Sequence, residues 1–303
     1  MGQLPDARRC SRSHAPTMTT TEPSESFQIP VEAAEFYESA FVPGFFAQWA
    51  PILCESAGVE PGKTVVDVAC GTGIAGRTAA DLVAPGGTVV GLDLNEAMLA
   101  VARRVRPEID WRQGDAATLP FDDESFDTAL CQMALMFFPD QAKALAEMRR
   151  VVRTDGTIAI AVPGRLDAQA AFAPFVSMAG RHAGPEAMSL LSAYFACGDL
   201  DALAGRVGSA GLEVTSARTH IGAYRAPSVD AFVTTEVEST PLLERISDDV
   251  YQRIRTDTHG VLAPFTTADG NVEAPFETNV VVARRRSARP SVTGLTPRRG
   301  REA

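Results

Sequence analysis

Three acidic residues stand in or just after short apolar runs that have the composition of buried strands. Asp67 lies within the first run, Asp93 ends the second and Asp115 follows the third. In a parallel sheet the carboxyl ends of neighbouring strands lie along one edge, so these carboxylates would come close together. A carboxylate only accepts hydrogen bonds when ionised, so Asp93 suits ribose hydroxyls and Asp115 suits an adenine amino group.

A glycine-rich loop connects the first run to the helix that follows it. Gly71, Gly73 and Gly76 form a G-x-G-x-x-G pattern, with Asp93 twenty positions after Gly73. This pattern is typical of dinucleotide binding, because the glycines let the backbone approach a pyrophosphate. Asp67, four residues before Gly71, would repel a pyrophosphate but suits a cationic ligand. S-adenosylmethionine is such a ligand, since it carries a sulfonium and an ammonium and no phosphate.

Strands and helices alternate along the middle of the chain. Such alternation predicts a parallel sheet with helices on both faces. The predicted strands are 64–69, 88–93, 109–113, 126–131, 157–162, 212–219 and 277–283. The predicted helices are those within 29–58, then 71–82, 95–105, 141–152 and 199–210, with Asn95 as an N-cap and a left-handed glycine near the end of 141–152.

Four motifs follow one another in these elements. They are residues 67–73 (DVACGTG), 91–98 (GLDLNEAM), 114–121 (GDAATLPF) and 125–132 (SFDTALCQ). In type, order and spacing they resemble the motifs of class I S-adenosylmethionine-dependent methyltransferases, in the ubiquinone/menaquinone-type branch called type 11. The resemblance covers residues 35–163. It implies a Rossmann-like α/β fold with a doubly wound, mostly parallel seven-stranded sheet, N-terminal helices and helical lid insertions.

The resemblance also implies a set of cofactor-binding residues. They are Tyr37, Asp67, Ala69, Gly71, Gly73, Asp93, Leu94, Met98, Asp115, Ala116 and Gln132. The backbone around Ala69 and Gly71 would hold the methionine moiety, and Asp67 would brace that loop. Gln132 would line the methionine pocket and face the acceptor, and Tyr37 would close over the methionine carboxylate.

The nucleoside half of the cofactor would be held by the ends of the second and third strands. By the same resemblance, Asp93 would bind both ribose hydroxyls, with Leu94 and Met98 close to the adenine. Asp115 and the amide of Ala116 would contact the adenine edge. The implied cofactor is therefore S-adenosyl-L-methionine.

We expect a methyltransferase for a small, hydrophobic acceptor. Methyl transfer from an activated sulfonium is helped mainly by orientation and exclusion of water, and no catalytic residue is assigned. Two alternatives stay open: an NAD-dependent oxidoreductase, and a protein of this fold that binds the cofactor without methylating. No metal is expected, since the cysteines form no C-x-x-C and the acidic run 122–124 has the composition of a solvated turn.

The remaining chain divides into tails and insertions. We expect disordered tails at 1–26 and 287–303 and a methyltransferase domain over 27–286. Within it, 27–58 would be N-terminal helices, 64–163 the cofactor-binding core, and 164–198 and 228–263 helical lids. The apolar 164–198 segment could serve as lid, core or both.

Composition limits the partners. The formal charge is −10, although the last twenty residues hold seven arginines against one acid. An acidic body disfavours nucleic-acid binding, which needs a basic face. No apolar run approaches the ~20 residues that span a bilayer. We therefore expect a cytoplasmic monomer or homodimer with free thiols and a small-molecule acceptor.

Overall fold

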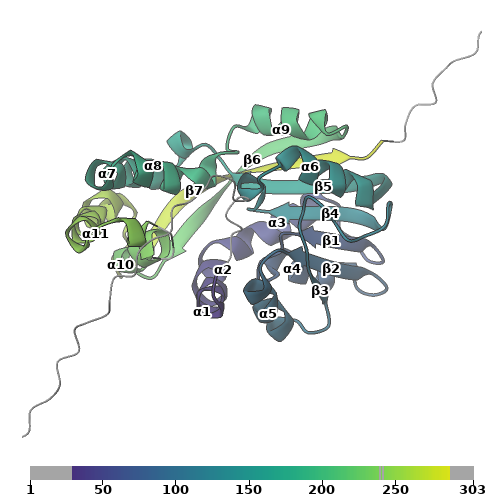
Figure 1. Ribbon diagram of the computed structural model, residues 1–303, viewed down its shortest axis with the longest axis horizontal. Helices are drawn as coiled ribbons and strands as arrows, with labels where there is room; N and C mark the ends of the chain where they lie inside the picture. The colour runs from purple at the N-terminus through teal and green to yellow at the C-terminus, as the bar shows by residue number, and fades with distance from the viewer. Residues whose placement is uncertain (1–28, 239, 241, 287–303) are drawn as a thin grey trace, which may run out of the picture.

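The computed structural model describes residues 29–238, 240 and 242–286. Its centre is one seven-stranded sheet in the order β3-β2-β1-β4-β5-β7-β6, in which only β7 runs antiparallel to its neighbours (Figure 1). The strands are β1 (Thr64–Val68), β2 (Thr88–Asp93), β3 (Asp110–Gln113), β4 (Phe126–Gln132), β5 (Val152–Pro163), β6 (Glu213–Ala226) and β7 (Val272–Arg284). The predicted doubly wound, mostly parallel sheet is confirmed. The tails predicted at 1–26 and 287–303 lie outside the described residues.

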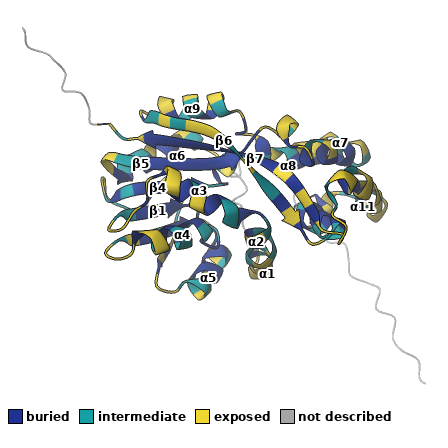
Figure 2. Ribbon diagram, turned by 180° about the vertical axis from the view of Figure 1, so that it is seen from behind, coloured by how far each residue is buried: buried dark blue, intermediate teal, exposed yellow. Residues whose placement is uncertain are grey.

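Helices cover the sheet on both faces. Helices α3 (Trp49–Ser56), α4 (Ile74–Val83) and α5 (Glu96–Val105) lie on one face, and α6 (Gln141–Val151) and α9 (Leu200–Ser209) on the other. Side chains alternate across a strand, so Val65 packs in the core under α3 and α4 while Val66 packs under α6. In Figure 2 most of β4 and the second half of β5 are coloured as buried. None of the helices among the described residues is long and apolar enough to cross a membrane.

The N-terminal segment is helical but changes its helix type. It runs through α1 (Val31–Phe36), a π-helical turn η1 (Tyr37–Phe41), α2 (Val42–Gly44) and the 3₁₀ turn η2 (Phe46–Gln48) before α3. The Arg77 guanidinium of α4 donates to both carboxylate oxygens of Glu38, at 2.8 and 3.1 Å. This fork holds the π turn next to the start of α4. π turns inside helices are frequent at functional sites.

Strands β6 and β7 continue beyond the sheet. Pairing of β5 with β7 ends at Pro163 and Thr278, whereas β6 and β7 stay paired as far as Ala226 and Val272. We call this extension, with the helices around it, the arm (Figure 1). Its helices are η4 (Leu166–Ala168), α7 (Phe172–Ala183), α8 (Pro185–Ser192), η5 (Ala193–Phe195), α10 (Val229–Val233), η6 (Thr234–Glu238), η7 (Leu243–Arg245), α11 (Asp248–Leu262) and η8 (Ala263–Phe265).

The arm has an aromatic core of its own. Phe172 lies at its centre, with ring centroids 5.2 Å from Tyr224, 5.4 Å from Phe232 and 5.3 Å from Phe276. Phe175 is fully buried in the same core. The two segments predicted as lids, 164–198 and 228–263, therefore pack on each other around one pair of strands.

Two details of the predicted elements are wrong. The last two strands are longer than predicted. Their extension contains residues of low strand propensity, such as Gly222 and Pro275, so the sequence did not indicate a strand there. The chain also passes from α6 directly into β5, and the left-handed residue there is Asp155 (φ 63°), not a glycine. Position 156 requires a glycine because there is no room for a side chain. A Cβ there would lie 2.6 Å from Val152 Cγ1 and 2.7 Å from the Asp127 carbonyl oxygen.

Candidate functional site

The loop between β1 and α4 is built from left-handed residues. Ala69, Gly71 and Gly73 have φ of 57°, 55° and 90°. A side chain at Gly73 is excluded by sterics as well, because its Cβ would lie 2.3 Å from Cη2 of Trp111 on β3. The loop is therefore pinned onto the Trp111 ring, which fixes where its backbone groups lie.

Asp67 is an acid buried beneath this loop. Its side chain is 1% exposed, and its Oδ2 accepts the Gly76 N–H at 2.7 Å. Burial raises the pKa of Asp67 to about 7, against the opposing hydrogen bond from Gly76 and with a smaller contribution from Asp93. The carboxylate thus holds an amide at the N-terminus of α4, where a dinucleotide fold would bind pyrophosphate.

Asp93 ends β2 with its carboxylate fixed by the backbone. Oδ2 accepts the Gly71 N–H at 2.7 Å and Oδ1 accepts the Asn95 N–H at 2.8 Å. Burial raises the pKa of Asp93, although the hydrogen bonds from Asn95, Gly71 and Leu94 oppose the rise. These three amides use most of the about four lone-pair sites of the carboxylate, so Asp93 can still accept from a hydroxyl group. Asn95 caps α5 as predicted, accepting from the amides of Ala97 and Met98.

The residues predicted to contact the adenine differ in how exposed they are. Leu94 is 42% exposed beside Asp93, and Asp115 is exposed with its Oδ1 accepting the Ala117 N–H at 2.8 Å. Ala116 is almost buried at 8%. Met98 is 7% exposed and packs under the N-terminal helix with Ala34 and Tyr37, so its contact to a ligand would be small.

Tyr37 stands over the glycine loop. A Cβ placed on Gly71 would lie 3.8 Å from the Tyr37 hydroxyl, and the Tyr37 ring stacks on Phe41 at 5.7 Å and on Phe46 at 4.9 Å. Burial raises the pKa of Tyr37, and the carboxylates of Asp93, Glu38 and Asp67 raise it further. The carboxylates of Asp93 and Asp67 therefore lie close to the loop, which favours a cationic ligand over an anionic one.

Gln132 and Thr72 leave buried polar atoms unpaired. Gln132 Nε2 donates to the Phe46 carbonyl at 3.1 Å, but its Oε1 has no partner among the described residues, and neither has Thr72 Oγ1. An unpaired buried polar atom costs about 1–3 kcal/mol, so such atoms are rare unless a ligand or an ordered water satisfies them. Both residues adjoin the carboxyl ends of the central strands.

Sequence reasoning missed three features at this edge. Met133, directly after β4, is left-handed with φ 55°. Phe137 of the 3₁₀ turn η3 (Leu135–Phe137) is 44% exposed and lies 6.0 Å from the ring of Tyr194. Glu236 of the arm is an acid whose pKa burial raises to about 7. Only the apolar residues around Phe137 gave a signal in the sequence, and it did not show which of them would be exposed.

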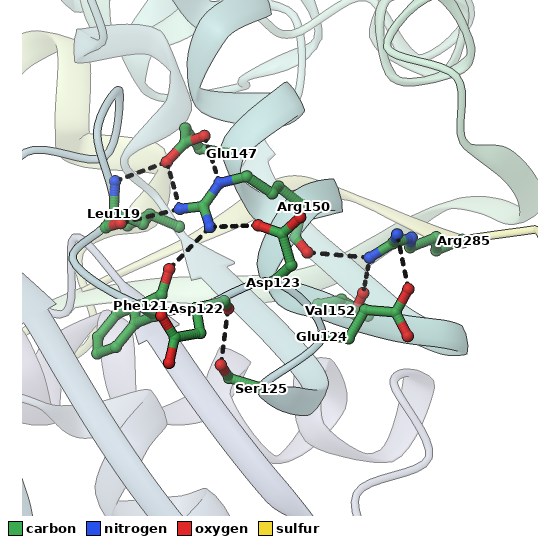
Figure 3. Close-up of polar contacts among 10 residues, drawn as sticks. All are labelled: Leu119, Phe121, Asp122, Asp123, Glu124, Ser125, Glu147, Arg150, Val152 and Arg285. Carbon is green, nitrogen blue, oxygen red and sulfur yellow. Dashed lines mark hydrogen bonds and ion pairs between the residues drawn. The ribbon is translucent and has the colours of Figure 1, made fainter.

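The acidic run 122–124 does not assemble a metal site (Figure 3). Asp123 pairs with Arg150 at 2.8 Å, and Glu124 pairs with Arg285 at 2.9 Å. Arg150 and Arg285 also donate to backbone carbonyls, so they join the turn to α6 and to the end of β7. Nowhere in the described residues do three or more His, Cys, Asp or Glu side chains gather as metal ligands would.

The histidines within the described range lie away from the glycine loop. His182 meets Asp257 at 2.7 Å on the arm, and His259 meets Asp230 at 3.4 Å. His220 lies on β6 opposite Thr278. None of these contacts involves a residue of the candidate cofactor site, so no histidine is placed there as a base.

Comparison with known proteins agrees with this geometry. The family model described as a methyltransferase domain, of type 11, matches residues 66–160. Over these residues the chain has a methyltransferase domain. S-adenosylmethionine is the cofactor of that domain family, and the predicted resemblance is confirmed.

Curated relatives match the methyltransferase domain only in part. Demethylmenaquinone methyltransferase from Renibacterium salmoninarum is 41% identical over 114 residues, which are 38% of this chain and 47% of that protein. The enzyme of the same name from Paenarthrobacter aurescens is 40% identical over 114 residues, 38% of this chain and 44% of that protein. The chain thus matches about half the length of these relatives.

Solved structures extend the likeness to the fold. A methyltransferase-like protein of Bacillus halodurans covers 78% of this chain with a TM-score of 0.52 at 20% identity, and 99% of its own chain is covered. The YcgJ protein of Bacillus subtilis covers 80% with a TM-score of 0.53 at 19% identity and is itself 99% covered. The [4+2]-cyclase SpnF covers 80% with a TM-score of 0.51 at 17% identity and is 82% covered. At these identities the likeness concerns the fold alone.

Proposed function

We propose that this chain is an S-adenosylmethionine-dependent methyltransferase that acts on a small, largely apolar acceptor. The observation that carries the proposal is the pair Asp67 and Asp93. Asp67 accepts the Gly76 amide at the N-terminus of α4 and Asp93 accepts the Gly71 amide, so two amides that a pyrophosphate would use are already occupied by acids. Acids suit a ligand with a sulfonium and an ammonium, and they disfavour the pyrophosphate of NAD.

The residues of this edge fit the cofactor. Asp93 would accept from a ribose hydroxyl, while Leu94 and Asp115 would border the adenine. Tyr37 and the unpaired Oε1 of Gln132 would contact the methionine end. Bound in this way, the cofactor would satisfy a buried polar atom that otherwise costs free energy.

The acceptor side is supplied by the N-terminal helices and the arm. Between them lies a cavity of about 620 Å³, lined in part by Phe41, Phe45, Tyr224, Thr234 and Thr235. This volume suits a small organic molecule, and the aromatic lining favours one with an apolar body. We take 164–198 and 228–263 as lids on this side of a 27–286 domain.

The cofactor supplies an activated methyl group, so the protein has mainly to orient the acceptor and to shield the reaction from water. The stacked rings of Tyr37, Phe41 and Phe46 would border the methyl group and the acceptor with apolar surface, which would keep water out. Gln132, held by the Phe46 carbonyl, would orient the acceptor next to the methyl group.

Calorimetry tests the cofactor, and a transfer assay tests the reaction. We expect the purified protein to bind S-adenosylmethionine and S-adenosylhomocysteine, and not NAD. With methyl-labelled cofactor and extracts of small molecules, label should pass into an organic-soluble product. Binding of NAD alone would contradict the proposal, and tight cofactor binding without any labelled product would favour a cofactor-binding protein that does not methylate.

A further inference from the structure

A line of polar groups leads from the glycine loop into the arm. Tyr194, in η5, has a buried hydroxyl with no hydrogen-bond partner among the described residues. Its ring lies 6.0 Å from Phe137 and 6.4 Å from Phe45, and Tyr37 and Glu236 both act on it electrostatically. Tyr194 thus lies where the arm meets the N-terminal helices and η3.

Glu236 is the next group along this line. It lies in the π turn η6, where its carboxylate accepts from the Tyr224 hydroxyl. Its surroundings are strongly desolvating, yet its side chain keeps part of its accessible surface, as do Tyr37 and Tyr194. Its chain neighbours Thr234 and Thr235 line the cavity of about 620 Å³, so Glu236 lies beside that space.

Glu236 is a desolvated acid without a cationic partner, in contrast to two acids of the arm that pair with arginines. Asp230 pairs with Arg255 at 2.7 Å, and Glu186 pairs with Arg245 at 2.5 Å. Within the described part of the chain no ion pair includes Glu236, and no Arg or Lys contributes to its titration. A buried carboxylate without a counter-ion is costly, so a cation delivered by a ligand would gain a strong partner there.

The rings beside Glu236 suit the same ligand. Tyr224 is 4% exposed and hydrogen-bonded to the carboxylate, and it also lines the cavity of about 620 Å³. Tyr194 adds a second ring and an unpaired hydroxyl. Aromatic faces attract an ammonium group and at the same time pack against an apolar body.

We propose that Glu236 determines acceptor specificity by binding a cationic amine on an otherwise apolar acceptor, with Tyr194 and Tyr224 around it. This proposal rests on the proposed function, because it assigns the acceptor side of the same site. It assigns recognition to Glu236 and leaves the methyl transfer itself to the groups around the glycine loop.

The test compares an amine with its neutral counterpart on the full chain. Calorimetry at pH 8 first measures affinity for S-adenosylhomocysteine, and the saturated protein is then titrated with 2-phenylethylamine and with 2-phenylethanol. We expect the amine to bind at least tenfold more tightly than the alcohol. Glu236→Gln should weaken amine binding at least tenfold and change alcohol binding and S-adenosylhomocysteine binding less than threefold.

A matched control is Glu244→Gln, an exposed acid of the neighbouring turn η7, which should bind both probes like the unmodified protein. Equal affinities for amine and alcohol, no amine binding, or unchanged amine binding by Glu236→Gln would each overturn the role of Glu236. Because the first comparison uses the unmodified protein, it decides the matter even where the variant does not fold. Failure to bind S-adenosylhomocysteine would instead contradict the proposed function.

Discussion

Asp67 should make the stability of this protein fall as pH rises. The carboxyl is 1% exposed, and burial raises its pKa from 3.8 to about 7. A folded state that holds the proton more tightly than the unfolded state is favoured at low pH. The stabilisation is therefore complete below pH 3.8, and it is lost as pH rises towards 7.

The size of this effect follows from the shift. A difference of about three pH units corresponds to about 4 kcal/mol of unfolding free energy, of which about 3 kcal/mol lies between pH 5 and pH 8. Asp67→Asn removes the titration and keeps an oxygen that can accept the Gly76 N–H. We therefore expect the variant to gain about 3 kcal/mol relative to the unmodified protein over that range.

Urea unfolding at pH 5, 6, 7 and 8 measures the change, with Trp111 beside the loop as a fluorescence reporter. Asp127→Asn is the control of opposite sign. Burial disfavours the ionised form of Asp127, but hydrogen bonds from Thr64 and Arg153 outweigh it and hold its pKa below the usual range. That variant should lose stability at neutral pH and approach the unmodified protein in acid. Parallel stability curves for Asp67→Asn and the unmodified protein would refute the buried-acid argument.

Three further variants test the site and its support. Asp93→Ala should weaken S-adenosylmethionine binding by about 1–3 kcal/mol in calorimetry, because it removes a charge-assisted hydrogen bond to the ribose, and wild-type affinity would exclude that contact. Arg77→Ala should cost about 1.5–3 kcal/mol of stability and weaken cofactor binding, because it frees the π turn η1 that carries Tyr37. Arg104→Ala removes only an exposed ion pair with Glu35 of the preceding helix α1 and should do neither. Arg285→Ala should lower the melting temperature by several degrees without changing cofactor affinity, since it loses two carbonyl contacts and Glu124 far from the loop.

The cofactor-binding core could be predicted because its signals are local. Buried parallel strands are recognisable as short β-branched runs, and the residue at the end of such a strand follows directly in the sequence, as Asp93 does at the end of β2. The cap at Asn95 and the glycines of the loop are likewise local. These short-range patterns placed β1 to β4 within one or two residues of their observed bounds.

The arm could not be predicted in the same way. Its strands are held by pairing between residues about fifty positions apart, such as Ala226 with Val272, and by the aromatic core that Phe172 organises. The sequence shows that Phe175 lies in an apolar segment, but it does not show that the side chain is fully buried inside the arm. It also gives no means of placing Glu236 near Tyr194, because only the three-dimensional packing brings η5 and η6 together.

The backbone is strained at two positions on the edge of the sheet that carries the candidate site. Ala69 and Met133 follow the central strands β1 and β4, and both are left-handed although neither is glycine. Such a conformation costs about 1–2 kcal/mol per residue and is kept only where the surroundings impose it. At Ala69 the next amide, that of Cys70, is tied to the Leu92 carbonyl at 3.0 Å, and Met133 N–H is tied to the Ala161 carbonyl at 2.7 Å. The neighbouring strands thus force both turns at the point where cofactor and acceptor would meet, which is where a fold that holds two ligands in line must be rigid.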